Sequence, residues 1–186
     1  MKRSQKRKEK MISPEHFIEL AKAEQEKWIN PVGRLILAAA SIERSVNEML
    51  EMIAPSEREV WRKEEFSARV KRLSDVSKET LSPNAVEALK DQKRKYWPVM
   101  ANRNAIAHNP LFFHSFSHGT EAFVSANIYH QQKDTAYELV SVQRFADEAD
   151  AVSAELMSFV ANFSRALKDE IDYRNILLAG MHLRAP

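Results

Sequence analysis

The residues best suited to chemistry lie in the short stretch RNAIAH at 103–108, which supplies Arg103, Asn104 and His108. A guanidinium binds phosphate oxygens through a planar fork of donors, and an imidazole transfers protons near neutral pH. The imidazole therefore suits general acid–base work. A structural explanation also stands, because cationic side chains are favoured at the C-terminal end of a helix.

The element that positions these residues is a predicted helix over 83–108. Ser82-Pro83 marks its start and Asn109-Pro110 its end. Pro98 lies inside it, so we expect a kink near residues 95–97. At about 100° per residue, Arg103 and His108 lie about 140° apart on a regular helix. In the middle of a helix these side chains would not meet, but near a helix end, with fraying and long side chains, both can converge on one small ligand.

A basic cluster precedes the expected kink in the same helix. It has two interpretations, a solvated helix face or a phosphate-binding track for RNA that leads to the helix end. Its members are Lys90, Lys93, Arg94 and Lys95.

Composition limits the other classes of function. The 186 residues suit one domain, and the absence of cysteine excludes disulfides and thiolate chemistry. Only three glycines are present, which disfavours glycine-rich phosphate loops. The first ten residues hold six Lys/Arg and one Glu, a local charge of +5, so residues 11–186 carry −3 of the total +2. We expect residues 1–12 to be a disordered basic arm, with loose binding of a polyanion as the alternative.

Apolar periodicity predicts further helices over about 14–28, 31–53, 56–79 and 142–170. Ser13-Pro14 and Asn30-Pro31 are start signals, and Ser56-x-x-Glu59 has the pattern of a capping box. Residues 121–140 are rich in β-branched and aromatic side chains and predict a β-hairpin. The expected fold is all-α, a four-to-five-helix bundle with this hairpin inserted before the last long helix. The bundle forms one domain over 13–175, followed by a tail over 176–186.

Metal and membrane roles are not predicted. His114 and His118 are four residues apart, but Ser115 and Gly119 indicate a loop around them rather than a helix. We therefore expect no metal and no cofactor. The most apolar run, LILAAASI at 35–42, is far shorter than the roughly 20 residues that span a bilayer. With no signal-peptide pattern either, the expectation is a cytoplasmic protein without a membrane partner.

The helix order and the RNAIAH stretch together resemble the HEPN superfamily of all-α domains, whose R-x4–6-H motif ends a late helix. Asn104 takes the polar position after the arginine. The stretch AAASIERSVNEML is similar to the family's early helix, in which an acidic residue faces the motif, and Glu43 would take that role.

The resemblance implies a metal-independent endoribonuclease that acts as a homodimer with a composite site. RNA supplies the 2′-OH as nucleophile. His108 would transfer a proton, Arg103 would bind the phosphate and Asn104 would orient the reacting groups. It further implies a toxin or defence role with an antitoxin or other protein partner. The alternative is a non-catalytic helical module for dimerisation or for binding RNA, nucleotide or protein.

Overall fold

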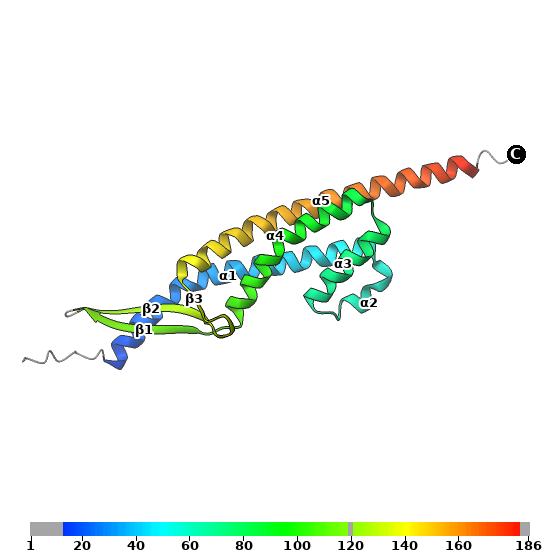
Figure 1. The fold of residues 1–186 in the computed structure, drawn as a ribbon. Coiled ribbons are helices and arrows are strands. Elements are labelled where there is room, and N and C mark those ends of the chain that lie inside the picture. Colours follow the sequence, from blue (N-terminus) through cyan, green and yellow to red (C-terminus); the bar gives the residue numbers. More distant parts are fainter. Residues whose placement is uncertain (1–12, 119–120, 183–186) are drawn as a thin grey trace, which may run out of the picture. The chain divides into compact units, whose positions relative to one another are not determined.

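The computed structural model describes the backbone of residues 13–118 and 121–182, and the side chains of residues 13–116, 121–130 and 132–168. Five α-helices and three strands lie in this part of the chain, in the order α1, α2, α3, α4, β1, β2, β3, α5 (Figure 1). The chain divides into two compact units. Of the described residues, the first unit contains 13–36 and those of Ala101–Asp147, and the second contains Leu37–Met100 and 148–182. A mostly helical chain with strands before its last helix confirms the predicted fold class at that level. The predicted arm, residues 1–12, lies outside the described residues.

The first helix, α1 (Pro14–Ile53), runs without a break through Pro31. The prediction of two helices separated at Asn30-Pro31 is therefore wrong. Proline removes one N–H donor and disfavours the helical region for the residue before it, but packing can outweigh both costs. Here Trp28, Pro31 and Leu35 are all buried at helical spacing, so one apolar stripe continues across the proline.

The segment predicted as one helix over 56–79 is divided. It forms a 3-10 turn (Pro55–Glu57), the short helix α2 (Arg58–Trp61) and, after a turn, α3 (Phe66–Thr80). The predicted capping box is not formed, since neither the turn nor α2 has a side-chain cap at its start. Burial explains the division. Trp61 is buried and its indole N–H donates to the Ala54 carbonyl over 3.3 Å, whereas the neighbouring Val60 is exposed.

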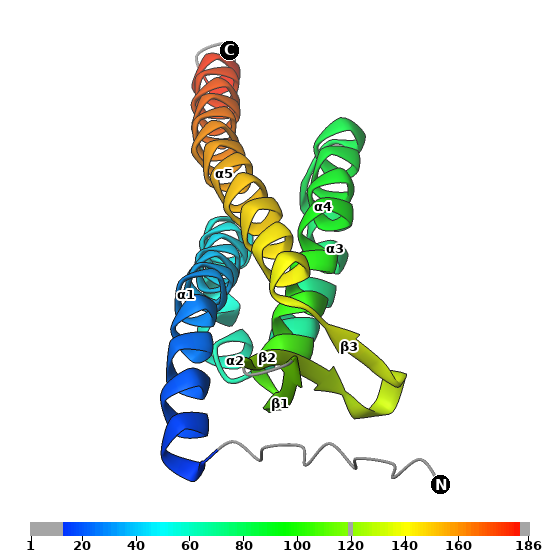
Figure 2. The same ribbon diagram turned by 90° about the vertical axis from the view of Figure 1, so that its left-hand side faces the viewer.

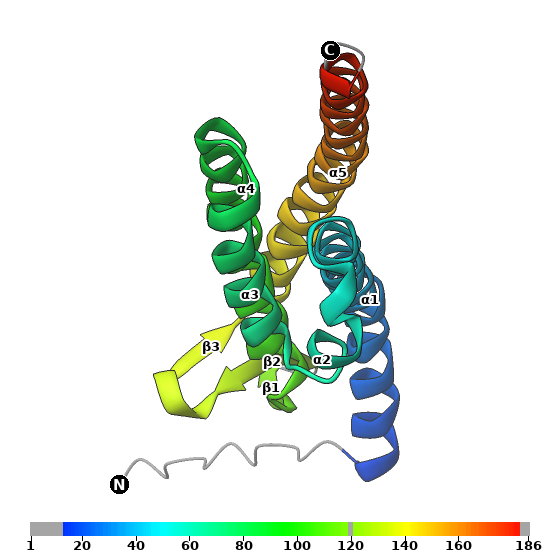
Figure 3. The same ribbon diagram turned by 90° about the vertical axis from the view of Figure 1, so that its right-hand side faces the viewer.

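In the second unit, α3 and the first part of α4 (Pro83–Ala107) form an antiparallel pair of helices (Figure 3). Phe66 at the start of α3 stacks on Trp97 and meets Tyr96 edge to face. Leu73 and Leu89 are buried further along. The helix predicted over 83–108 is confirmed, and Pro98 lies inside it as expected.

In the first unit, three antiparallel strands follow α4 and precede α5 (Figure 2). They are β1 (Leu111–His118), β2 (Glu121–His130) and β3 (Thr135–Tyr137). The predicted hairpin is confirmed as β2 and β3, with Asp134 at a φ of 50° in the connection. The interpretation of the stretch around His114 as a loop is wrong. Three phenylalanines lie among Ser and His there, and β2 supplies the hydrogen-bonding partner for a full strand.

The last helix, α5 (Leu139–His182), is longer than the predicted 142–170 and continues into the segment expected as a tail. The sequence predicts that this helix packs lengthwise through a stripe at steps of four and three, formed by Phe145, Ala149, Val152, Leu156, Phe159, Phe163 and Ala166. Ala149, Leu156 and Phe163 are buried, the other three large side chains of the stripe are half-buried, and Ala166 at its end is exposed. Ser41 of α1 and Met157 of α5 are in contact within the second unit, with 3.4 Å between hydroxyl oxygen and sulfur.

Candidate functional site

The C-terminal end of α4 carries the three predicted catalytic residues. The helix ends at Ala107, and the backbone N–H of His108 still donates to the Asn104 carbonyl over 3.2 Å. Asn109 Nδ2 donates to the Ala105 carbonyl over 2.6 Å, which satisfies one of the carbonyls left open at a helix end. Sequence reasoning used Asn109 only as the residue before a proline. Its capping role was missed, although asparagine just after a helix is a known signal.

Arg103 is held by its neighbour in the chain. Its Nη1 donates to Asn104 Oδ1 over 2.9 Å. Its Nε is buried and has no hydrogen-bond partner among the described residues. A buried donor without an acceptor costs free energy, and such groups in native proteins call for an explanation in strain or function.

Asn104 connects the other two residues of the motif. Its side chain accepts from Arg103 and its main-chain carbonyl accepts from the backbone N–H of His108. Between them, Ala105 and Ile106 are buried and fix the helix end, whereas the side chains of Asn104 and His108 are exposed. The structure therefore places a guanidinium, an amide and an imidazole at one anchored helix end.

Glu43, the predicted supporting acid, belongs to the second unit and binds Arg69 there. Arg69 Nη2 lies 3.3 Å from Glu43 Oε2, and Arg69 Nη1 donates to Asn47 Oδ1 over 2.6 Å. The three side chains form a polar cluster on α1 and α3. A role for Glu43 toward the motif stays a prediction.

Ion pairs hold most of the basic cluster on α4. Lys90 Nζ lies 2.9 Å from Glu87 and its hydrogen bond holds the pKa of that carboxyl below its ordinary value. Arg94 pairs with Asp91 and with Glu87. A phosphate that bound these two cations would have to compete with carboxylates already in place.

The other two members of the basic cluster differ from each other. Lys95 pairs with Glu155, and this contact, helped by Gln92, lowers the pKa of the Glu155 carboxyl. Lys93 lies over the Trp97 ring, with 5.7 Å between Nζ and the ring centroid. Binding of RNA by the cluster stays a prediction, and Lys93 is the member best placed for it.

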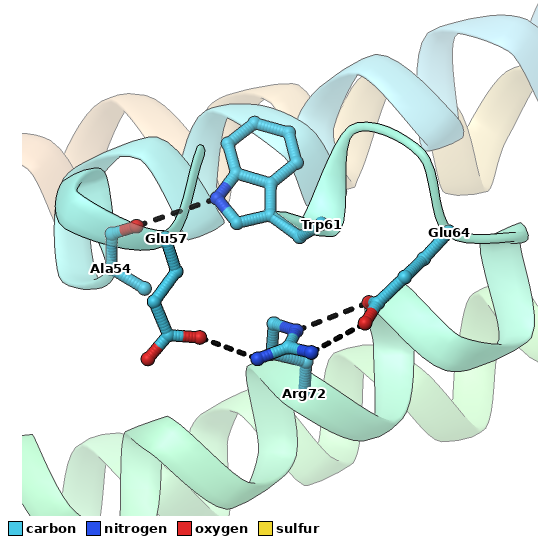
Figure 4. Close-up of polar contacts among 5 residues, drawn as sticks. All are labelled: Ala54, Glu57, Trp61, Glu64 and Arg72. Atoms are coloured by element: carbon cyan, nitrogen blue, oxygen red, sulfur yellow. Dashed lines mark hydrogen bonds and ion pairs between the residues drawn. The ribbon is translucent and has the colours of Figure 1, made fainter. Parts of the chain in front are cut away.

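A second arginine site, which the sequence analysis did not find, lies after the end of α1. Arg72 donates to both carboxylate oxygens of Glu64 and to Glu57 (Figure 4). These hydrogen bonds raise the pKa of Arg72 and lower that of Glu64. The cluster joins α3 to the turn before it, and its charges are already satisfied.

Of the two histidines considered as metal ligands, His114 and His118, the structure describes the side chain of His114. His114 Nε2 and Asn127 Nδ2 are joined by a hydrogen bond of 3.1 Å across β1 and β2. The side chain of His118 lies outside the described part. Among the described residues no three His, Asp or Glu side chains gather closely enough to hold a metal ion.

Comparison with known proteins identified no relative of this chain. No protein-family description, no curated protein and no solved structure matches this chain. Over the part of the chain that the structure describes, none of the helices has the length and hydropathy required to cross a bilayer.

Proposed function

We propose that this chain is a metal-independent endoribonuclease of the HEPN type, with Arg103, Asn104 and His108 as its catalytic residues. The position of Asn104 carries the proposal. It accepts hydrogen bonds from both the Arg103 guanidinium and the His108 backbone, at a helix end anchored by buried neighbours. A phosphate-binding cation and a proton-transfer group thus stand within one turn and a half of the same helix end, and the imidazole is exposed.

The reaction is a transesterification within RNA. The 2′-oxygen forms a bond to the adjacent phosphorus while the bond from phosphorus to the 5′-oxygen breaks. His108 takes the proton of the 2′-OH or gives one to the leaving 5′-oxygen. Arg103 stabilises the negative charge that develops on the phosphoryl oxygens. The products are a 2′,3′-cyclic phosphate and a free 5′-OH, so this step consumes no water.

This step needs both a proton acceptor and a proton donor, and a single His108 serves one of these roles at a time. A second copy of the chain would supply the other imidazole. The proposal therefore includes a homodimer with a composite site, and a toxin or defence role with an antitoxin as protein partner.

Cleavage of RNA in EDTA tests the catalytic assignment. We expect wild type to cut, and Arg103→Ala and His108→Ala each to lose activity by at least about 10²-fold while remaining folded. His16→Ala and Arg165→Ala are matched controls, because both remove exposed side chains of the same types on other helices. Activity that survives in the His108 variant would remove the catalytic assignment. Cleavage that stops in EDTA would remove the metal independence.

A non-catalytic interaction module is the second candidate, and a groove in the second unit favours it. The groove holds about 520 Å³ and is lined by α1 and α5. Met157 on its wall is 57% exposed, and Leu37, one turn before Ser41, is 72% exposed. Exposed apolar side chains beside a groove indicate a docking surface. In this case Met157→Glu would lower the mass measured in solution, and wild type would cut no RNA.

A further inference from the structure

The pair of helices α3 and α4 carries basic side chains along a narrow crevice between the two helices. Ser74 of α3 and Lys90 and Lys93 of α4 line the crevice, together with the buried Ser77. Its other lining residues are apolar or aromatic, namely Val70, Leu73, Val86, Leu89 and Tyr96. The crevice holds about 20 Å³, which is room for about one water molecule. A larger ligand would therefore lie across its mouth and meet the polar side chains there.

Three exposed residues continue this basic edge. Lys71 stands three residues before Ser74 and Lys78 four residues after it, so the helical period places the three side by side on α3. Trp97 follows Lys93 by four residues and lies beside it on α4. We call this set the α3–α4 surface. It consists of Lys71, Ser74, Lys78, Lys90, Lys93 and Trp97.

The opposite side of the helix pair is covered by other helices of the second unit. Arg69 of α3 pairs with Glu43 of α1, and Lys95 of α4 pairs with Glu155 of α5. On the α3–α4 surface, by contrast, four of the six residues are exposed and the other two are half-buried. A ligand can therefore reach the pair from this side.

Lysines outnumber carboxylates on the α3–α4 surface. Its four lysines have two acidic neighbours, Asp75 and Glu87. Asp75 pairs with Lys78 over 3.2 Å, and Glu87 pairs with Lys90 over 2.9 Å. All four side chains are about half exposed, and ion pairs in such positions are screened and weak. The surface is therefore positive, and its two ion pairs are open to exchange.

The other acidic residues near this surface do not reverse its charge. On α4, Asp91 is paired with Arg94. Glu79 follows Val70 by nine residues, which the helical period places on the opposite side of α3. The turn before α3, residues 62–65, holds two cations and two carboxylates.

Lys71 and Lys93 are the cations most open to a ligand. Neither forms an ion pair within the described residues, and Lys93 lies instead over the Trp97 ring, with 5.7 Å between Nζ and the ring centroid. They stand on the two helices that border the crevice, because Lys93 lines it together with Val70, the residue before Lys71. A phosphate at the mouth of the crevice therefore has a cation on each side.

Trp97 gives the α3–α4 surface a flat ring. It is 43% exposed and stacks on Phe66, with centroids 6.4 Å apart and planes 20° apart. Lys93 precedes it by one helical turn, about 5.4 Å along the axis. Proteins that bind single-stranded nucleic acid combine the same two features, cations that follow the backbone and an aromatic ring on which a base stacks.

We propose that the α3–α4 surface binds single-stranded RNA, with Lys71 and Lys93 on the phosphates and Trp97 stacked on an unpaired base. The inference rests on the proposed function for its choice of RNA. Its positive charge suits a polyanion. The exposed indole favours a nucleic acid over an acidic protein, whose carboxylates offer no ring to stack on it. Paired bases in a duplex cannot offer their faces to Trp97, so the surface selects unpaired RNA.

The salt dependence of RNA binding tests the two lysines. A labelled oligouridine of about ten nucleotides is titrated in EDTA and followed by fluorescence anisotropy, and all proteins carry His108→Ala so that the RNA stays intact. We expect the Lys71→Gln, Lys93→Gln double variant to bind about tenfold more weakly. The slope of log K against log salt should flatten by about 1.4, since each phosphate contact on a single strand contributes about 0.7. An unchanged slope would overturn the proposal.

The matched control for the lysines is the Lys22→Gln, Lys168→Gln double variant. It removes two exposed lysines from α1 and α5, with the same change in net charge, and should keep the slope of the parent protein. Competition with polyglutamate tests the kind of partner. Polyglutamate that displaces the oligouridine at equal concentration of charge would assign the surface to an acidic protein and overturn the proposal.

Intrinsic fluorescence tests Trp97. The chain has three tryptophans, and Trp28 and Trp61 are buried. A base that stacks on Trp97 should quench its emission, and Trp97→Phe should abolish this quenching while its own ring keeps most of the affinity. Trp97→Leu keeps apolar area without a π face and should bind about tenfold more weakly. Parent affinity in Trp97→Leu, or equal affinity of the parent for duplex RNA, would overturn the proposal.

The two proposals fail separately. If wild type cleaves RNA but the lysine and Trp97→Leu variants keep full affinity, the α3–α4 surface is wrong and the catalytic assignment stands. If these variants lose affinity but wild type cuts nothing, the catalytic assignment is wrong and the α3–α4 surface stands. If the parent protein does not bind oligouridine at all, the α3–α4 surface is overturned.

Discussion

Arg72 and Arg103 are both partly shielded from solvent, but their surroundings differ. Arg72 donates to Glu64 through two atoms and to Glu57 through a third (Figure 4). Arg103 makes one hydrogen bond to the uncharged amide of Asn104, and its buried Nε has no acceptor among the described residues. The Arg72 guanidinium therefore has carboxylate acceptors for its donors. The Arg103 guanidinium has a buried donor without an acceptor among the described residues.

This difference separates a structural arginine from a candidate functional one. An arginine between two carboxylates orders the segments that it joins and offers little to a ligand. An arginine with an unpaired buried donor costs stability, which is acceptable where a site requires it. The comparison predicts that changes near Arg72 affect folding, whereas changes near Arg103 affect activity.

The largest expected effect on stability is at Trp61, beside the Arg72 cluster. Trp61→Ala removes a buried indole and its hydrogen bond to the Ala54 carbonyl. We expect a loss of about 3–5 kcal/mol in the free energy of unfolding, measured by urea denaturation. Trp61→Phe keeps most of the apolar volume and should lose less. A loss below about 1 kcal/mol for the alanine variant would contradict the packing of this region.

A matched pair of methionine substitutions tests the comparison directly. Arg72→Met leaves Glu57 and Glu64 without their shared cation, so Tm should fall by about 3 °C or more. Arg103→Met removes an unpaired buried donor, so Tm should stay unchanged or rise, while RNA cleavage is lost. Differential scanning calorimetry measures both. A drop in Tm for Arg103→Met as large as for Arg72→Met would show that Arg103 is structural.

Acid should weaken the Arg72 cluster. The pKa of Glu64 is lowered in the folded protein, chiefly by its hydrogen bond with Arg72. The unfolded chain therefore binds the proton more readily, and the stabilisation is full at neutral pH and decreases as pH falls below about 5. Glu64→Gln should be less stable than wild type at pH 7, and the difference in Tm should shrink toward pH 3. A difference that grows on acidification would contradict the lowered pKa.

The smallest expected effect is at Asn109, which caps the helix that carries the candidate site. Asn109→Ala removes the hydrogen bond to the Ala105 carbonyl and should cost about 0.5–1.5 kcal/mol in the free energy of unfolding. Because the cap lies next to His108, RNA cleavage should fall more than this loss of stability accounts for. Asn109→Asp is not an equivalent replacement, since a carboxylate cannot donate to the carbonyl. Unchanged cleavage in Asn109→Ala would show that the cap does not position His108.

Elements with strong local signals could be predicted from the sequence. The helix that carries the candidate site was predicted over 83–108 and observed over Pro83–Ala107. Ser82 accepts a hydrogen bond from the backbone N–H of Ala85, as expected of a residue that begins a helix. The helix end between Ala107 and Pro110 followed from the restriction that proline places on the residue before it.

Elements that depend on distant partners were missed. The continuation of α1 through Pro31 depends on burial of that side of the helix. Strand β1 depends on β2, because its Ser and His residues carry little β preference of their own. The exposed rings of Phe112, Phe116 and Phe123 on β1 and β2 were missed for the same reason, since the two strands come together only through pairing.

The sequence by itself determined the helix over Pro83–Ala107, its start at Ser82 and the placement of Arg103, Asn104 and His108 at its end, because spacing and backbone restrictions act between near neighbours. Only the tertiary structure decided which charged groups are already used. Glu43 pairs with Arg69, Lys95 with Glu155 and Arg72 with two glutamates, whereas the buried Nε of Arg103 has no acceptor within the described part of the chain. The physical reason is that an ion pair depends on the distance between two groups in space, not along the chain. Residues 60 positions apart, such as Lys95 and Glu155, meet only when the fold brings them together.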